Sequence, residues 1–264
     1  MNKIKAYLII TATTFFASNI YAQTLPDKVS HAEPLYLDLV RDLGARKGEK
    51  ELNVGTEFIN TNDYKENAFL VEYEFAPINR LGFEVEADFS LFKSTQPAVT
   101  APANKLECLR FSTQYSFFVS TKHRTTLAVG YTQILEFIDF KNQNNQQIIT
   151  ATTYNPFFVA AKRFGKNFHS LVYVSPLIHH DLLEESTHFN WQINTSVHYV
   201  IPNTKNFVGI ELNKEISGGV FSMTVRPQVK VKLNSQLALG FVTGIPVNKN
   251  NEGYSSFLRL IYEL

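Results

Sequence analysis

Hydrophobic and polar residues alternate one by one along most of this chain. The pattern is clearest in Phe69–Leu91, where two alternating runs flank a break at residues 77–80, Pro-Ile-Asn-Arg. In both runs the apolar residues fall on odd positions and the acidic residues on even ones. Because side chains alternate across a strand with a period of two, this stretch predicts a hairpin with one apolar and one acidic face. The acidic positions are Glu72, Glu74, Glu84, Glu86 and Asp88.

The same alternation recurs and predicts twelve strands. Each strand is roughly twice as long as the five or six residues typical of globular sheets. At about 3.3 Å per residue, a tilted strand of this length crosses an outer membrane. The predicted strands are 50–60, 66–77, 80–93, 106–120, 123–138, 150–164, 167–178, 188–201, 205–215, 219–232, 235–246 and 252–264.

The connections between these strands alternate in length. Short turns are predicted at 77–80, 120–123, 165–167, 202–205 and 233–236, and longer polar loops at 93–105, 139–150, 179–187 and 247–252. The short links 61–65 and 216–219 depart from the rule. Short turns at one end and long loops at the other are typical of transmembrane barrels. The predicted fold class is therefore all-β, a transmembrane antiparallel up-and-down β-barrel of about twelve strands. Ten or fourteen strands, or a soluble periplasmic β-sandwich, are the alternatives.

The chain begins with the layout of a secretory signal. Lys3 and Lys5 precede an apolar run from Ala6 to Ala17, and Ala22 suits a cleavage site. This predicts a signal peptide over 1–22, a periplasmic N-terminal segment over 23–49 and a barrel over 50–264. The segment contains leucines at every fourth position between Pro34 and Gly44, which predicts a short helix. We expect this helix to cover the periplasmic mouth of the barrel or to act as a small plug.

Composition narrows the class further. The hydrophobic fraction is an ordinary 44%. Because the net charge is only +1, nucleic acid is not an expected partner. The single cysteine, Cys108, cannot form an internal disulfide. Leu258, Leu260, Tyr262 and Leu264 share one face at the C-terminus, as in terminal strands that the outer-membrane barrel-assembly machinery reads. The expected partners are this machinery and the outer-membrane lipid bilayer of a Gram-negative bacterium.

Two segments resemble a family of exported bacterial outer-membrane β-barrel proteins. They are HAEPLYLDLVRDLGARKGEKELNVG at His31–Gly55 and LVEYEFAPINRLGFEVE at Leu70–Glu86. The resemblance implies an exported barrel. It carries no catalytic or binding residue over to this chain.

The charged residues on the predicted inward faces are unevenly distributed. Acids gather on early strands and bases on late ones, and the closure of a barrel makes the first and last strands neighbours. Such opposed charges either screen solutes in a water-filled lumen or close a narrow barrel by pairing. The residues predicted to line the lumen are Glu72, Glu74, Glu84, Glu86, Asp88, Arg110, Arg226, Lys230, Lys232 and Arg259.

The sequence also contains two weaker candidates for a chemical site. His179, His180, Asp181 and His188 offer imidazole and carboxylate groups in a predicted loop, a weak candidate for a Zn²⁺ or Cu²⁺ site. His169-Ser170 and His198 with Ser196 are candidates for a lipid-modifying enzyme on the outer surface, although no hydrolase motif surrounds them.

We find no cofactor-binding motif and predict no cofactor. The sequence therefore favours a non-enzymatic pore or channel for a small polar solute. The alternative is a closed barrel with a structural or loop-mediated binding role.

Overall fold

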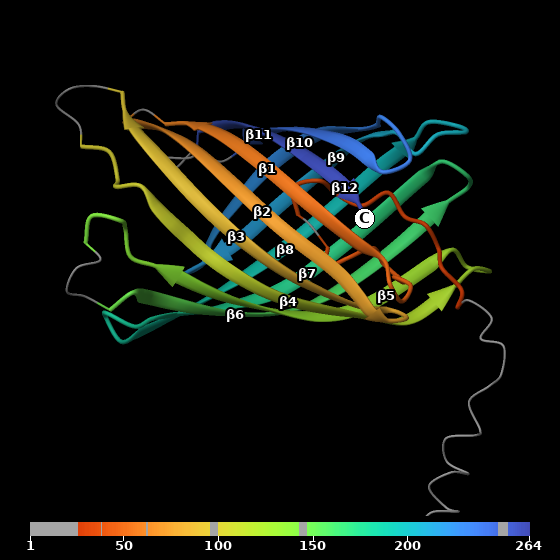
Figure 1. The fold of residues 1–264 in the computed structure, drawn as a ribbon, viewed down its shortest axis with the longest axis horizontal. Coiled ribbons are helices and arrows are strands. Elements are labelled where there is room, and N and C mark those ends of the chain that lie inside the picture. Colours follow the sequence, from red (N-terminus) through yellow and green to blue (C-terminus); the bar gives the residue numbers. More distant parts are fainter. Residues whose placement is uncertain (1–25, 38, 62, 96–99, 143–146, 248–252) are drawn as a thin grey trace, which may run out of the picture.

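The chain folds into one closed antiparallel β-barrel of twelve strands (Figure 1). The computed structural model describes residues 26–37, 39–61, 63–95, 100–142, 147–247 and 253–264. Each strand pairs with its sequence neighbours, and β1 closes the barrel against β12. The strands are β1 (Lys50–Asn60), β2 (Tyr64–Ile78), β3 (Leu81–Ser94), β4 (Lys105–Ser120), β5 (Thr125–Phe137), β6 (Ile149–Phe164), β7 (Phe168–Asp181), β8 (Ser186–Val200), β9 (Phe207–Ser217), β10 (Val220–Lys232), β11 (Leu237–Pro246) and β12 (Tyr254–Glu263).

The predicted barrel and its twelve strands are confirmed, because every expected strand overlaps one of the observed strands. The signal peptide predicted over 1–22 lies outside the described residues. The loop predicted over 179–187 is wrong, since His179 pairs with His188 in the β7–β8 ladder. The Asp181 carboxylate accepts the backbone N–H groups of Leu183 and Glu184, which closes a tight turn after the extended hairpin. Polarity alone does not separate such a strand extension from a loop.

The outer face of the barrel is a band of exposed apolar side chains. Neighbouring residues of β2 show the contrast, since Val71 is 46% exposed and Glu72 is 1% exposed. Phe75 and Phe83 stack across β2 and β3, with ring centroids 5.7 Å apart. A continuous apolar surface of this kind is stable in lipid and costly in water. Among the residues that the structure describes, no helix is long and apolar enough to cross a membrane.

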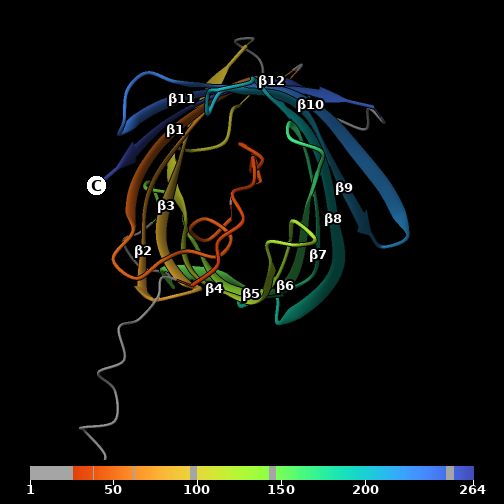
Figure 2. The same cartoon turned by 90° about the vertical axis from the view of Figure 1, so that its right-hand side faces the viewer.

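Residues 26–37 and 39–49 follow the inside of the barrel, and we call this segment the plug (Figure 2). Its described residues form bends and turns and contain no helix, so the helix predicted over Pro34–Leu43 is wrong. The plug enters from the end of the barrel that carries the C-terminus and the short turns. We call this the short-turn end, and the opposite end, with the β3–β4, β5–β6 and β11–β12 connections, the long-loop end.

The plug avoids a helix because side chains of the barrel wall satisfy its backbone donors. Leu35 N–H donates to Gln228 Oε1 at 2.7 Å, and Leu37 N–H donates to Glu211 Oε1 at 3.0 Å. In the same way, Gly44 N–H reaches Ser116 Oγ at 2.8 Å. Buried backbone donors need partners, and here strand residues supply what a helix would supply internally.

Apolar plug residues pack on two sides of the wall. Leu39, Val40 and Leu43 join a buried cluster with residues of β5, β6 and β7. Ala32 and Leu35 join a second cluster with residues of β9, β11 and β12. The leucine spacing that suggested a helix thus serves to bridge the lumen.

Candidate functional site

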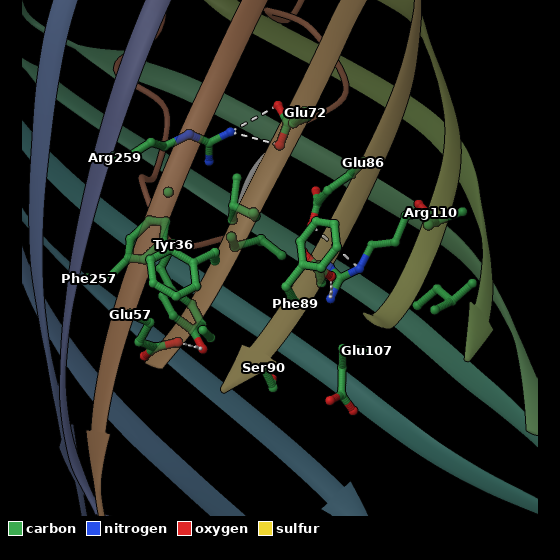
Figure 3. Close-up of a pocket in the computed structure, with 18 of the residues that line it drawn as sticks. Tyr36, Glu57, Glu72, Glu86, Phe89, Ser90, Glu107, Arg110, Phe257 and Arg259 are labelled. Carbon is green, nitrogen blue, oxygen red and sulfur yellow. Dashed lines mark hydrogen bonds and ion pairs between the residues drawn. The ribbon is translucent and has the colours of Figure 1, made fainter. Parts of the chain in front are cut away.

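The plug separates two cavities inside the barrel. The larger cavity, of about 710 Å³, is bounded by Tyr36, Leu37 and Val40 of the plug and extends to Pro102 in the β3–β4 connection. Figure 3 shows its wall, where side chains of β1, β2, β3, β4 and β12 point inward. The cavity therefore runs from the plug toward the long-loop end of the barrel.

Carboxylates outnumber bases in the lining of the larger cavity. Because the wall is shielded from lipid and bulk water, these charges act on any solute that enters. The acids are Glu57, Glu66, Glu72, Glu84, Glu86, Asp88 and Glu107, and the bases are Lys105, Arg110 and Arg259.

The bases of the larger cavity are already paired. Arg259 Nη2 contacts both carboxylate oxygens of Glu72, at 3.0 and 2.9 Å (Figure 3). Arg110 Nη2 lies 2.9 Å from Asp88 Oδ2, and its Nε lies 3.6 Å from Glu86 Oε1. These ion pairs hold the side chains of the wall in place but leave an excess of carboxylates in the larger cavity.

Glu66 and Glu84 carry that excess. Their carboxylates accept hydrogen bonds from Ser90 Oγ and Ser112 Oγ, at 2.8 and 2.9 Å. Among the described residues, no cationic group pairs with either of them within 4 Å. A cationic solute in the larger cavity would meet two uncompensated carboxylates.

The plug inserts its own arginine into an acidic pocket of the wall. Arg41 Nη1 lies 2.6 Å from Glu51 Oε2 and 3.6 Å from Glu74 Oε2. Its Nη2 lies 3.1 Å from Glu263 Oε2, so β1, β2 and β12 all bind one guanidinium. The Arg41 side chain is 2% exposed, which makes it a buried anchor of the plug.

Glu72, Glu74 and Glu84 form the one group of potential metal ligands found among the described residues. Their carboxylates already have partners. Asn53 Nδ2 donates to both Glu72 and Glu74, at 2.7 and 3.1 Å, and Arg259 pairs with Glu72. These contacts account for the cluster without an ion.

The smaller cavity, of about 260 Å³, lies at the short-turn end and is mainly basic. Its lining includes the plug residues His31, Glu33 and Asp42. Burial, together with the nearby His169, lowers the pKa of His31 to about 3. Burial and the neighbouring Asp42 raise the pKa of Glu33 to about 8. The basic residues are Lys28, Arg163, Lys166, Lys205, Lys230 and Lys232.

The ten charged residues predicted to line the lumen occupy four places on the inner face. Six of them line the larger cavity: Glu72, Glu84, Glu86, Asp88, Arg110 and Arg259. Lys230 and Lys232 line the smaller cavity, Glu74 lies beside Arg41, and Arg226 pairs with Glu57 at 3.5 Å. Acid and base meet near the β1–β12 seam, as the Arg259–Glu72 pair shows.

Sequence reasoning missed the plug residues that complete the site. Tyr36, Arg41 and Gln228, the wall residue that accepts the Leu35 N–H, make contacts that no local sequence pattern predicts. An arginine within a short apolar segment, opposite an acidic wall, was the available signal for Arg41.

The histidine candidates are dispersed. His169 and His198 are buried inside the barrel, where His169 Nδ1 accepts the backbone N–H of Ala32 at 2.6 Å. Neither lies on the outer surface where a lipid-modifying enzyme would need it. His179 and His188 face each other with ring centroids 6.4 Å apart, whereas the His180 ring forms a separate hydrogen bond with the Thr187 hydroxyl. With Asp181 engaged in a turn, the four metal candidates do not converge.

A closed barrel with an apolar outer band and a charged interior defines an outer-membrane β-barrel protein. The chain belongs to the HAEPLYID-like family, whose model matches residues 27–263. No curated protein matches the chain.

Solved structures with a similar fold are outer-membrane barrels. The COG4313 outer membrane channel from Pseudomonas putida F1 superposes with a TM-score of 0.68 at 11% identity, over 85% of this chain and 98% of that one. The KdgM porin gives 0.54 at 11% identity, over 81% and 99% of the two chains. The NanC porin gives 0.54 at 10% identity, over 81% and 100%. At such identities the likeness is one of fold.

Proposed function

We propose that this protein is an outer-membrane channel for small polar solutes and that the plug closes its lumen in the structure described. The long-loop end then faces the exterior and the short-turn end the periplasm. Passage, rather than catalysis, is supported by the burial of His169 and His198 inside the barrel. β12 presents Leu258, Leu260 and Tyr262 outward, which suits recognition by the barrel-assembly machinery.

The observation that carries the proposal is the position of the plug between two cavities. Tyr36, Leu37 and Val40 bound the larger cavity, and His31, Glu33 and Asp42 of the same segment line the smaller one. The plug is the structure that separates them. Before Ala45, the described residues of the plug contact the wall through side-chain hydrogen bonds and packing, and backbone hydrogen bonds to the wall begin at Ala45, whose C=O accepts the Arg80 N–H. This part of the plug can therefore leave the lumen without breaking the barrel.

A disulfide lock tests whether the plug controls passage. A Cβ atom at Gly240 would lie 3.4 Å from Leu35 Cγ, the position that the Sγ atom of a cysteine at 35 would take, so the pair lies within reach of a disulfide. We would combine Leu35→Cys and Gly240→Cys with Cys108→Ser, which removes the native thiol. The refolded variant is then measured in a planar bilayer before and after reduction.

The expected result is silence when oxidised and discrete current steps when reduced. Cys108→Ser alone should conduct under both conditions. Equal conductance of the locked and reduced forms would show that the plug does not close the lumen. Silence of wild type, Cys108→Ser and the reduced variant, all shown to be folded, would favour a closed barrel with a structural or loop-mediated role.

A further inference from the structure

Arg226 of β10 forms a three-residue contact with the plug and with β1. Its guanidinium carbon lies 3.2 Å from the centroid of the Tyr36 ring. Its Nη1 lies 3.5 Å from Glu57 Oε1, and the Tyr36 hydroxyl donates to Glu57 Oε2 at 3.3 Å. We call Tyr36, Glu57 and Arg226 the latch, because together they join the plug to the wall.

The surroundings shape a slot for the guanidinium. Arg226 Nη1 also donates to Ser255 Oγ at 3.2 Å. A Cβ atom at Gly244 would lie 2.6 Å from the same nitrogen, so only glycine leaves room there. Tyr36 packs edge-on against Phe257, with centroids 5.8 Å apart (Figure 3). The Tyr36 face is thus held in position to receive a planar cation.

Two members of the latch, Tyr36 and Glu57, also line the larger cavity. A solute in that cavity has access to the carboxylate and the aromatic ring that bind Arg226. Phe157 and Tyr173 add a second aromatic pair to the wall, stacked with centroids 5.1 Å apart. An excess of carboxylates beside aromatic faces is the chemistry that recognises organic cations. Arg226 shows that a guanidinium fits it.

We propose that the larger cavity binds a small planar organic cation of the guanidinium or amidinium class, which displaces Arg226 from Tyr36 and Glu57 and so releases the plug. The binding part of this inference stands by itself, whereas the release rests on the proposed function. A ligand that takes the Glu57 carboxylate from both Arg226 and the Tyr36 hydroxyl binds only when these contacts of the plug are broken, and so it shifts the population toward the open channel. The solute would then open the path by which it passes.

Calorimetric titration of the refolded full chain in detergent tests the binding. Benzamidinium is the cationic probe, and benzamide and benzoate are the neutral and anionic molecules of matched shape. We expect benzamidinium to bind about tenfold or more tightly than benzamide, with no heat from benzoate. Equal affinity for benzamidinium and benzamide would overturn the proposal.

Variants locate the site. Glu57→Gln should weaken benzamidinium binding by about tenfold, whereas Glu184→Gln, in the exposed β7–β8 turn, should leave it unchanged. Arg226→Met removes the internal competitor and should tighten binding, an effect that a merely structural arginine would not produce. Unchanged affinity in both Glu57→Gln and Arg226→Met would contradict the assignment. Tyr36→Phe, which removes the hydroxyl that competes for Glu57 and should tighten binding, replaces Arg226→Met if that variant fails to fold.

Bilayer recordings distinguish binding of the cation from release of the plug. Benzamidinium should raise the open probability of wild type, and benzamide should not. Binding without this increase would overturn the release by the latch and leave the disulfide test of the plug unaffected. Conductance that responds to the disulfide lock, combined with no benzamidinium binding, would overturn the ligand class and keep the proposed channel.

Discussion

At the scale of single residues, the plug is held by positions that look unremarkable in the sequence. A Cβ atom at Gly82 would collide with the carbonyl oxygen of Val40, and one at Gly240 would press on the Leu35 side chain. Both glycines lie in strands and make space for the plug. His31 is a further contact of this kind, with Nε2 3.0 Å from Thr126 Oγ1.

His31 should make the plug sensitive to acid. Its pKa is lowered to about 3 when docked, by burial and by the nearby His169 and Arg163, and returns toward 6.5 when released. Neutral His31 makes its full contribution to docking above about pH 6.5, and this contribution is lost as the pH falls from 6.5 toward 3, by about 1.4 kcal/mol per pH unit. Protonation of His31 should therefore raise the open probability in bilayers between pH 7 and pH 5, while Glu33 acts in the opposite direction.

The variant His31→Asn isolates this effect, because other groups titrate in the same range. Glu33 has the opposite effect on the pH dependence of docking. Its raised pKa favours docking at low pH and opposes it as the pH rises from 4.5 toward 8. His169, Arg163 and Asp42 remain in the variant. We expect the ratio of the open probability at pH 5 to that at pH 7 to be lower in His31→Asn than in wild type. Identical pH profiles would show that His31 does not control docking.

At the scale of elements, strands were predictable and the plug was not. Strand alternation is a local property, so the sequence around Phe69–Leu91 specifies the hairpin by itself. The plug conformation depends on acceptors that lie far away in the chain, such as Ser116, Glu211 and Gln228. A leucine repeat favours a helix only when no other partner competes for the backbone. The acidic inner wall was likewise predictable from the sequence, whereas its pairing with Arg41 was not.

Arg41 should decide whether the plug stays docked. Arg41→Met leaves the buried Glu51 and Glu74 without this cation, and breaking one side of a buried ion pair costs about 3–5 kcal/mol. We expect a large rise in open probability, while the barrel keeps its heat-modifiable mobility on gels. Lys47→Met changes an exposed charge of the same segment and should behave as wild type. A closed Arg41→Met channel would mean that apolar packing alone holds the plug.

At the scale of the whole molecule, the lumen is polarised along its axis. The cavity toward the long-loop end is dominated by carboxylates, and the cavity at the short-turn end is dominated by lysines and arginines. The plug lies between these regions, where Arg41 binds acids of the wall and Lys28 Nζ bonds to Asp42 and Glu49 of the plug itself. Releasing the plug would join an acidic entrance to a basic exit.

Ion selectivity of the open channel follows from which of these regions controls entry. The larger cavity carries the uncompensated Glu66 and Glu84, so we expect K⁺ to permeate several times better than Cl⁻ in the reduced disulfide variant. Reversal potentials across a KCl gradient measure this ratio. Glu66→Gln with Glu84→Gln should lower it, and Glu184→Gln should not.

Screening of the wall charges by salt provides an independent check on the permeability ratio of K⁺ to Cl⁻. The Debye length shortens from about 10 Å at 0.1 M salt to about 3 Å at 1 M, so a preference set by wall charges should weaken in concentrated KCl. A preference for K⁺ that persists unchanged at 1 M would point to size or dehydration in place of charge. Selectivity for Cl⁻ would assign control to the lysines and arginines at the short-turn end, and would also weaken the case for an organic cation as the solute.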